Sequence, residues 1–349
     1  MKKPPSPTTR KSPGPRKPSR AAILFPVFLL SLLPGFSPPA RAQFTQQGDK
    51  LVGADASGTQ PPSLGSLSSA AGAGAISADG NTAVVGRPWD GFVTSGSAPG
   101  ALLVFTRTNG AWTQQGPKLV VTSDGNQFGF SVAISADGNT VIAGVPLDAF
   151  TGAVVVFTRT NGAWSQQGGK LLPSDATIDP HGNAVEFGSS VALSADGNTA
   201  LVGGPVDNDS RGAVWVFVRA DGVWSQQGNK LVGTGAATSS LGVGAHQGGS
   251  VALSADGNTA LVGGSADNFD LGTHESTGAV WVFTRSNGVW SQQGNKLVGT
   301  GAAPVPGGAP AGGGGRAIPS RFLPTGIRPS SEEEPTRDCP RNSALSTEV

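Results

Sequence analysis

The feature that most constrains the fold is an internal repeat. The hexapeptide Ser-Ala-Asp-Gly-Asn-Thr recurs at spacings of 58, 59 and 60 residues, beginning at Ser77, Ser135, Ser194 and Ser254. Each copy is followed by Val-Phe-Thr-Arg or Val-Phe-Val-Arg, an Asn-Gly or Asp-Gly pair, a Trp and a Gln-Gln-Gly triplet. A fixed period of this length is typical of chains that stack copies of one supersecondary unit. We therefore expect four complete units and the opening of a fifth.

Each unit is expected to contain four short strands. In the third unit they span residues 190–193, 199–203, 213–219 and 223–231, with Asp196-Gly197 and Asp221-Gly222 in the tight connections. Asp-Gly supplies the positive φ angles that two-residue hairpin turns require. The 53 Gly and 27 Pro among 349 residues disfavour long helices. Each unit is therefore predicted to be a four-stranded antiparallel meander.

The inner strands of the units are apolar on both faces. Residues 214–217, Val-Trp-Val-Phe, are an example, and such strands need neighbours on both sides. Repeated four-stranded sheets that pack face to face are the blades of a β-propeller. One alternative is a β-solenoid, whose coils are much shorter than this period; another is a string of separate sandwiches, although a single two-faced sheet cannot stand alone. The predicted fold class is all-β, a β-propeller of four-stranded blades over residues 43–301.

Within this pattern, short motifs at the ends of the strands resemble FG-GAP repeats, the blades of the integrin α-subunit head and of many secreted bacterial proteins. One motif is Phe-Gly before the first strand, at Phe128-Gly129 and Phe187-Gly188. The other is Gly-x-Pro after the second strand, at Gly86-Arg87-Pro88 and Gly144-Val145-Pro146, with Gly203-Gly204-Pro205 close to this pattern. The resemblance covers residues 44–301, although the first and fourth units lack Phe-Gly. It implies a propeller often of seven blades, an extracellular location, and ligand binding or adhesion. Four blades in frame would leave such a ring incomplete.

The first 42 residues have the order of a secretory signal peptide. Seven basic residues in the first twenty precede an apolar stretch over residues 21–36 and then Ala40-Arg41-Ala42. The stretch is shorter than the ~20 residues that span a membrane as a helix. A retained membrane anchor is the alternative. We expect export to a periplasmic or extracellular location, with cleavage after Ala42.

Residues 302–349 have the composition of a disordered tail, but their codons suggest another origin. When residues 315–336 are back-translated and read in a shifted frame, the codons permit 19 of the 21 residues over 247–267. The mismatches fall only at Gly249 and Ser265. We interpret the tail as an out-of-frame translation of a fifth repeat, with the shift between Ala303 and Gly315. The lone Cys339 would then have no selected role.

Charge and cysteine content exclude several classes of protein. Residues 43–301 hold 11 basic and 18 acidic side chains, a net charge near −7. An acidic surface repels phosphates, so nucleic acid and anionic membranes are poor partners. A single Cys cannot form a disulfide framework or a cysteine metal cluster.

Calcium is the one metal that the residue types suggest. In integrin-like blades, the resemblance implies a calcium site in the hairpin between the first two strands. Here that turn holds one carboxylate, too few for the six to eight oxygen ligands of calcium: Asp79, Asp137, Asp196 or Asp256. Better metal candidates lie between the second and third strands: Asp207, Asn208, Asp209, Asp267, Asn268 and Asp270. Asx residues are also common in any solvated loop, so the prediction is no obligatory cofactor, with calcium as the alternative.

The topology predicts one face for binding. The short repeated hairpins lie on one face, and the loops between second and third strands, 87–100, 145–152, 205–212 and 265–278, lie on the other. Variable loops on a constant scaffold are where ligands bind. The candidate ligand-binding residues on these loops are Trp89, Asp90, Asp148, Asp207, Asp209, Asp267 and Asp270. The repeated tryptophans are expected to pack between blades instead: Trp112, Trp164, Trp224 and Trp290.

Signatures of catalysis are absent from the sequence. The histidines His181, His246 and His274 lie in loops of different units, and no His-x-x-x-His or Gly-x-Ser-x-Gly motif occurs. We expect a secreted, noncatalytic propeller that binds an extracellular protein or glycan. The alternative is a secreted hydrolase with nonrepeating acids at the central channel, and a third is the product of a gene remnant. Repeated small and apolar residues at the axis would favour the scaffold.

Overall fold

A computed structural model describes residues 46–53, 73–91, 98–121, 127–178, 184–237, 244–270 and 275–299. The predicted signal peptide and the C-terminal tail lie outside the described residues. All strands belong to one compact unit that begins at Gln47. Among the residues described, no helix is long and apolar enough to cross a membrane.

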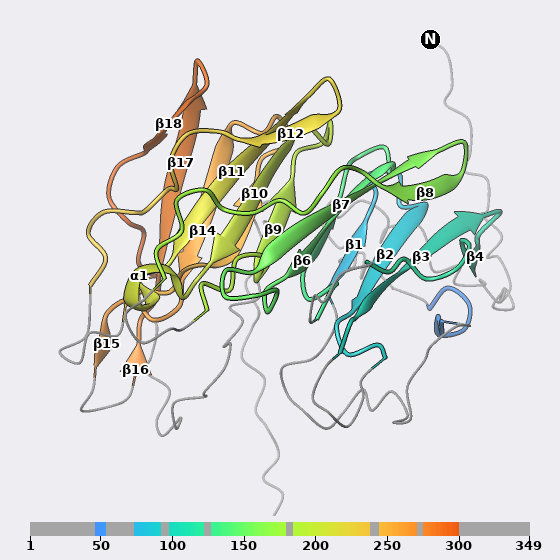
Figure 1. The fold of residues 1–349 in the computed structure, drawn as a ribbon, viewed down its shortest axis with the longest axis horizontal. Coiled ribbons are helices and arrows are strands. Elements are labelled where there is room, and N and C mark those ends of the chain that lie inside the picture. Colours follow the sequence, from blue (N-terminus) through green and yellow to red (C-terminus); the bar gives the residue numbers. More distant parts are fainter. Residues whose placement is uncertain are drawn as a thin grey trace, which may run out of the picture. The chain divides into compact units, whose positions relative to one another are not determined.

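Four four-stranded antiparallel sheets form the blades of a β-propeller (Figure 1). In every sheet the strands pair in chain order, as a meander requires. Blade 1 contains β1 (Gly74–Ile76), β2 (Thr82–Arg87), β3 (Ala101–Thr108) and β4 (Ala111–Gln114). Blade 2 contains β5 (Val132–Ile134), β6 (Thr140–Val145), β7 (Ala153–Thr160) and β8 (Ala163–Gln166). Blade 3 contains β9 (Ser190–Leu193), β10 (Thr199–Gly204), β11 (Ala213–Ala220) and β12 (Val223–Gln226). Blade 4 contains β13 (Gln247–Leu253), β14 (Thr259–Gly264), β17 (Ala279–Ser286) and β18 (Val289–Gln292). The predicted fold class is confirmed.

The two kinds of connection lie on opposite faces. A one-turn helix, α1 (Asp207–Ser210), and a two-residue hairpin of β15 (Phe269–Asp270) and β16 (Glu275–Ser276) lie in connections between second and third strands. In Figure 1 they lie at the bottom, whereas the β17–β18 turn lies at the top. We call the side with α1, β15 and β16 the loop face and the opposite side the turn face.

The fourth strand is shorter than predicted. Residues 223–231 were expected to be continuous, but β12 ends at Gln226 and Leu231 pairs with Val214 only as an isolated bridge. The Gln226 side-chain amide donates to the Gly228 carbonyl at 2.9 Å, and Gly228 has a φ of 71°. This small turn interrupts the strand, because its backbone leaves the extended region.

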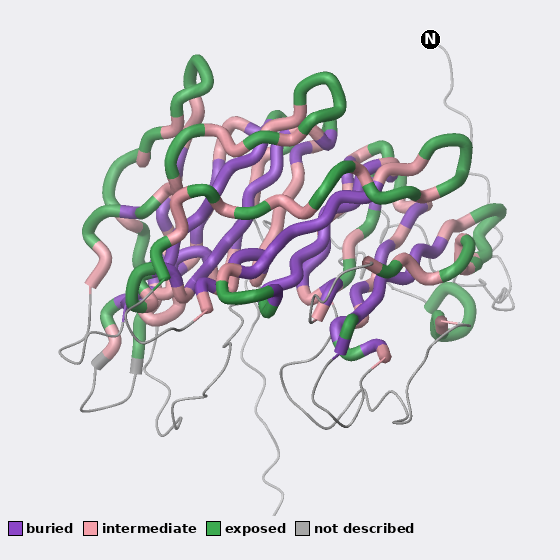
Figure 2. Tube along the Cα trace, viewed as in Figure 1, coloured by how far each residue is buried: buried purple, intermediate pink, exposed green. Residues whose placement is uncertain are grey.

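Consecutive blades pack through apolar faces (Figure 2). At the junction of blades 2 and 3, Ile142, Val154 and Val156 contact Val202 and Trp215, and all five are at most 1% exposed. Equivalent clusters join blades 1 and 2 and blades 3 and 4. The repeated sequence therefore builds the same interface three times.

The first strands line the inner edge of the blades. Strands β1, β5, β9 and β13 contact one another in succession. A chain of backbone hydrogen bonds connects the turns at this edge, from Ala78 N–H to Ala136, from Ala136 to Ala195 and from Ala195 to Ala255, at 2.9–3.0 Å. Small alanines allow the turns this close approach.

A short N-terminal segment covers the outer face of blade 1. Arg107 donates to the Gln47 side-chain carbonyl at 3.2 Å, and Gly53 packs on Leu103. Arg159 makes the same bond to Gln115 of the preceding blade at 3.0 Å, and Gly233 packs in the same way on Trp281. Residues 46–53 therefore occupy the place of the Gln-Gln-Gly segment that follows the last strand of a preceding blade.

Candidate functional site

The repeated Ser-Ala-Asp-Gly-Asn-Thr turn satisfies its own polar groups. In blade 3, the Ser194 hydroxyl donates to Asp196 at 2.5 Å, and the Asn198 backbone and side-chain N–H groups donate to the same carboxylate at 2.9 and 3.2 Å. The Thr199 N–H donates to Ser194 Oγ at 2.9 Å. Burial raises the pKa of Asp196, but the hydrogen bonds from Ser194 and Asn198 outweigh it and leave this pKa below its usual range. The turn is structural, and its carboxylate is fully used.

An Arg and a Trp of each blade bind a Gln of the blade before it. Trp224 Nε1 and Arg219 Nη1 both donate to Gln167 Oε1 at 3.1 Å, and the guanidinium lies 5.4 Å from the Trp224 ring centroid. Arg219 Nη2 reaches Thr140 Oγ1 of the preceding blade at 3.3 Å. The same contacts join Trp164 to Gln115 and Trp290 to Gln227. The expected packing between blades is confirmed for Trp164, Trp224 and Trp290.

Four of the predicted ligand-binding aspartates lie in repeated ion pairs. The pairs have N···O distances of 2.5–2.6 Å and carboxylates that are at most 12% exposed: Asp90–Lys118, Asp148–Lys170, Asp207–Lys230 and Asp267–Lys296. Asp90 also contacts Arg87 at 3.2 Å. Each Lys comes two residues after Gln-Gln-Gly and anchors the loop to its own blade. One aspartate per blade thus has the same structural partner.

The predicted calcium ligands separate into buried and exposed groups. The Asp207 carboxylate accepts a hydrogen bond from Thr177 N–H at 2.6 Å in addition to Lys230, and Asp267 accepts one from Ala237 N–H at 2.8 Å. Asn208 and Asp209 are exposed with positive φ, and Asn268 is exposed. The side chain of Asp270 lies outside the described residues. Within the described ranges, no three His, Cys, Asp or Glu side chains come together as a metal site, and calcium binding stays a prediction.

The loop face exposes four large apolar side chains. Phe150 is 66% exposed, Ile178 48%, and Trp89 and Leu147 each 40%. Trp89, Leu147 and Phe150 belong to loops between second and third strands, and Thr177, the neighbour of Ile178, bonds to the α1 loop through Asp207 and Asn208. Of the residues predicted for binding, Trp89 and Asp209 are thus exposed on this face.

A second group on the loop face differs from blade to blade. Gln127, Glu186 and His246 occupy one position, four residues before Ser131, Ser190 and Ser250, respectively, each with a φ between 54° and 67°. His246 N–H donates to Ser210 and Gln127 N–H to Ala98, so this position lies beside the loop of the preceding blade. Burial raises the pKa of Glu186 and lowers that of His246. These are half-buried groups with variable chemistry at the junctions.

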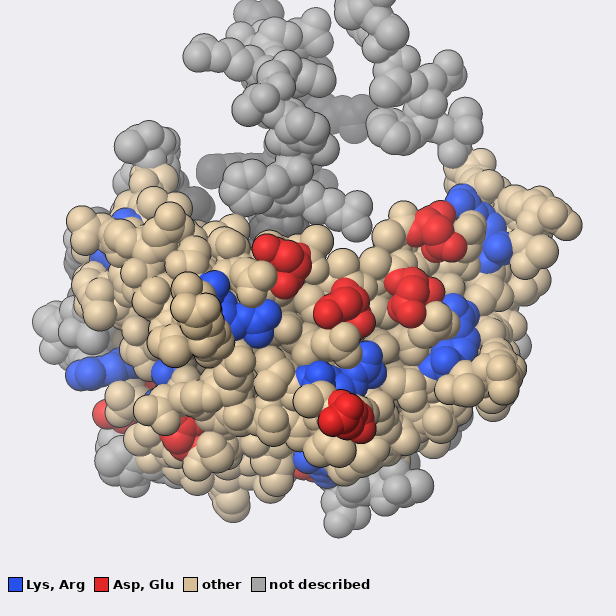
Figure 3. All heavy atoms as spheres, turned by 90° about the horizontal axis from the view of Figure 1, so that it is seen from above, with Lys and Arg blue, Asp and Glu red and all other residues tan. Residues whose placement is uncertain are grey.

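The turn face has mixed charge. In the view from above Figure 1, Lys and Arg side chains lie interspersed with Asp and Glu (Figure 3). A nucleic-acid surface needs a continuous basic stripe. This face does not offer one among the side chains drawn.

Comparison with known proteins finds no family, only solved structures of low similarity. No family model matches it, and no curated protein matches it in sequence, so the resemblance to FG-GAP repeats stays a prediction. Three solved structures that it resembles are a candidate 6-phosphogluconolactonase of Bacteroides uniformis (TM-score 0.43, 14% identity), a periplasmic gluconolactonase of Pseudomonas aeruginosa (0.40, 18%) and TolB of Acinetobacter baumannii (0.35, 12%). The matches cover 65%, 69% and 63% of this chain and 54%, 61% and 42% of those chains, respectively. The chain therefore spans about half the length of these structures, and at such identities the likeness extends to the fold alone.

The sequence predicted which loops share a face more reliably than the surroundings of the residues on them. Glu186 and Phe150 were not singled out, and His246 was taken for a solvated loop residue. Alignment of the units could have found Glu186 and His246, because the position before Phe-Gly or Gln-Gly is polar yet never repeated. The Asp–Lys pairs also had a signal, since both residues recur in every unit.

Proposed function

We propose that this chain is an exported propeller that binds an extracellular protein or glycan through its loop face. The observation that carries the proposal is the exposure of Phe150, Trp89, Leu147 and Ile178 on one face of the blades. Aromatic side chains bordered by polar groups are typical anchors of binding surfaces. The polar border here would be Gln127, Glu186 and His246.

The proposal is tested by screening the full chain on a glycan array and an array of purified cell-surface proteins. Phe150→Ser should weaken binding of any partner found at least tenfold, because a buried aromatic anchor is worth more than ~1.4 kcal/mol. Val289→Ser is the matched control, since Val289 is 69% exposed but begins β18 at the turn face. Equal effects of the two substitutions, or no partner on either array, would contradict the proposal.

A second candidate function, hydrolysis, is favoured by Glu186 and His246. A carboxyl whose pKa is raised and an imidazole whose pKa is lowered are suited to act as general acid and base, respectively. Both occupy the nonrepeating position at neighbouring junctions. The described first strands, however, repeat small and apolar residues apart from Gln247, as expected of a scaffold.

Hydrolysis is tested with gluconolactone, because the neighbours reported above include gluconolactonases. If Glu186 is the general acid, Glu186→Gln should lower kcat at least a hundredfold, while Gln127→Ala, at the same position of blade 2, should leave kcat within threefold. A rate for the unaltered chain that equals the uncatalysed rate would exclude this activity.

A further inference from the structure

At each internal junction, a glycine of the second strand lies against a backbone carbonyl of the next blade. The Ser131 hydroxyl of blade 2 donates to the Gly188 carbonyl of blade 3 at 2.7 Å, and Ser190 of blade 3 donates to Gly248 of blade 4 at the same distance. These carbonyls lie against Gly144 and Gly203, where a Cβ would come within 1.9 and 2.0 Å of them. Glycine is therefore required in the second strand because the next blade touches its backbone.

A second contact joins the loop of one blade to the opening of the next. Gly152 forms a parallel bridge with Phe187, and Gly212 forms one with Gln247. At the second of these junctions, the buried Gln247 amide also bonds both the N–H and the carbonyl of Gly233, at 2.5 and 3.0 Å. In a repeat that begins with Gln-Gly, the Gln side chain thus hydrogen-bonds the backbone of the Gly in the Leu-Val-Gly segment of the preceding blade.

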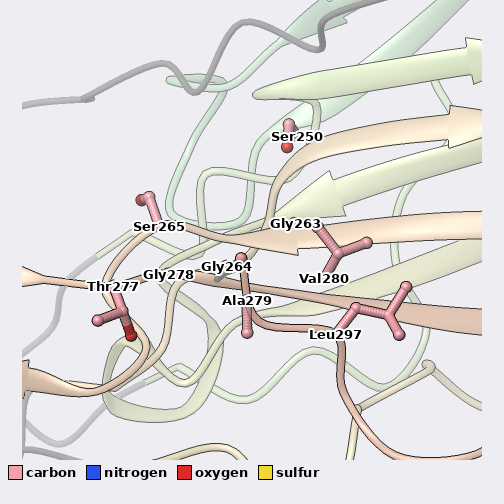
Figure 4. Close-up of a pocket in the computed structure, with 10 residues that line it drawn as sticks. Ser250, Gly263, Gly264, Ser265, Thr277, Gly278, Ala279, Val280 and Leu297 are labelled. Atoms are coloured by element: carbon pink, nitrogen blue, oxygen red, sulfur yellow. The ribbon is translucent and has the colours of Figure 1, made fainter. Parts of the chain in front are cut away.

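Blade 4 carries all of these groups on a face that no described residue covers. Ser250, Gly263, Gly278 and Gly299 correspond to Ser190, Gly203, Gly212 and Gly233, respectively, and they line a hollow of about 220 Å³ (Figure 4). The three atoms nearest to a Cβ at Gly263 all belong to Ser250 of its own blade, with the hydroxyl oxygen at 2.2 Å and no carbonyl of a following blade among them. At Gly278 the nearest atom is 3.5 Å away, whereas at Gly212 it is 2.1 Å away.

The apolar wall beside this hollow is also open. Leu261, Val280 and Val282 are half-buried, but their counterparts in blade 3, Leu201, Val214 and Val216, are at most 1% exposed. The hollow is smaller than the ~300–1,000 Å³ typical of small-molecule sites. Its glycines and apolar wall fit a sheet better than a ligand.

A second copy of this chain fits the open face poorly. Docking head to tail would bring Gln293 and Gly299 of one copy onto blade 1 of the other, where Gln47 and Gly53 already make the equivalent contacts. Blade 1 also has Ala70-Ala71 where blades 2 and 3 have Phe-Gly. The occupant must instead open on a residue pair such as Gln-Gly.

We infer that the open face of blade 4 is the docking surface for a fifth repeat that opens on Gln-Gly, the repeat whose codons persist in the shifted frame of residues 315–336. Those codons permit both Gln247 and Gly248 of the fourth repeat, together with its Ser250 and Ser-Ala-Asp-Gly-Asn-Thr turn. The Gln would bond Gly299, and the Gly carbonyl would accept from Ser250. This inference is independent of the proposed function.

The docking surface is tested in the full chain and in an extended chain, in which residues 1–299 are followed by a second copy of residues 234–299. Gly263→Ala in the first copy should lower the Tm of the extended chain by about 4 °C or more, because its methyl group would meet the backbone of the docked repeat, and leave that of the full chain within about 1 °C. Gly203→Ala, the matched control, should lower both. An unchanged Tm of the extended Gly263→Ala variant would overturn the inference, as would a dimer of the full chain that Gly263→Ala dissociates.

A second measurement needs no destabilised variant. Val282→Cys should react with a maleimide at least tenfold more slowly in the extended chain than in the full chain, in which Cys339→Ser removes the other thiol. Equal rates would overturn the docking.

Sequencing the gene beyond the codon for Gly299 tests the source of the repeat. A one- or two-base insertion or deletion before codon 315 would support the shifted frame as the source of the fifth repeat. An unbroken frame would overturn this source.

Discussion

At the scale of the residue, the repeated polar side chains serve structure. Asp196 accepts three hydrogen bonds inside its own turn, and Asp207 is held by Lys230 and Thr177. A carboxylate in such contacts has little capacity left for a ligand. The groups free to vary are those that the repeat does not specify, such as Phe150 and Glu186.

Asp196→Ala should lower the free energy of unfolding by about 1–2 kcal/mol at pH 7, because three hydrogen bonds to a charged acceptor are lost. The pKa of Asp196 is lower in the folded chain than in the unfolded one, so its contribution is present above pH ~3.9 and is lost as the pH falls through the folded value. Urea unfolding at pH 7 and pH 3 measures the difference. A deficit at pH 3 as large as that at pH 7 would contradict this account.

Asp207→Ala should lower the free energy of unfolding by about 3 kcal/mol, because Lys230 would be left partly buried without its partner. Asp209→Ala is the control, since Asp209 is exposed on the same loop, and its effect should stay within about 0.5 kcal/mol. Both are measured by urea unfolding with and without a calcium chelator. A chelator that lowers the stability of the unaltered chain but not that of the two variants would show that the loop aspartates bind calcium.

Glu186→Gln should stabilise the chain at pH 7. Burial raises the pKa of Glu186 above its unfolded value, so the charged form is disfavoured in the fold and stability is lost as the pH rises through the folded pKa. The neutral amide avoids this penalty, and its advantage should vanish below pH ~4.3. Tm measured from pH 3.5 to 8 tests the sign; a variant less stable at pH 7 would show that the carboxylate has a stabilising partner.

At the scale of the element, the segments at the ends of the strands form hydrogen bonds across the junctions between blades. Gln167 directly follows β8, the last strand of blade 2. Its hydrogen-bond partners Arg219 and Trp224, however, belong to blade 3. Gln-Gln-Gly therefore serves twice, because its first Gln closes a local turn and its second binds the next blade.

Gln167→Ala should lower the free energy of unfolding by about 1–2 kcal/mol, since two part-buried donors lose their acceptor. A double-mutant cycle with Trp224→Phe should give a coupling of at least ~0.5 kcal/mol. Gln293→Ala is the matched control, because Gln293 has the same place in blade 4 and no described blade follows it. If both Gln substitutions lower the free energy of unfolding by the same amount, the contact of Gln167 with blade 3 contributes nothing to stability.

The sequence predicted most of the elements, since Asp-Gly turns and two-faced apolar runs place strands to within one or two residues. It missed the end of β12, because the Gln226–Gly228 turn depends on a local hydrogen bond within an otherwise extended run. It predicted the loop face from topology but not the ion pairs of its aspartates Asp90, Asp148, Asp207 and Asp267. Their lysines lie 22 to 29 residues away along the chain, and only the fold brings them together.

At the scale of the whole molecule, repeated junctions between blades hold the chain together, and the face of blade 4 carries the groups of such a junction with no described residue against it. Val216 and Val282 occupy the same position in β11 and β17. Val216 is 1% exposed at the junction of blades 3 and 4, and Val282 is half-buried. Val216 packs in the cluster between blades 3 and 4, whereas Val282 belongs to none of the described clusters.

The most direct test is urea unfolding of the full chain with Val216→Asp and, separately, Val282→Asp. Val216→Asp should cost at least ~3 kcal/mol or prevent folding, because it buries an unpaired charge between blades. Val282→Asp should cost less than ~1 kcal/mol, because its side chain can reach water. Equal losses in the two variants would contradict the claim, since they would show that the face of blade 4 is buried as fully as the internal junctions.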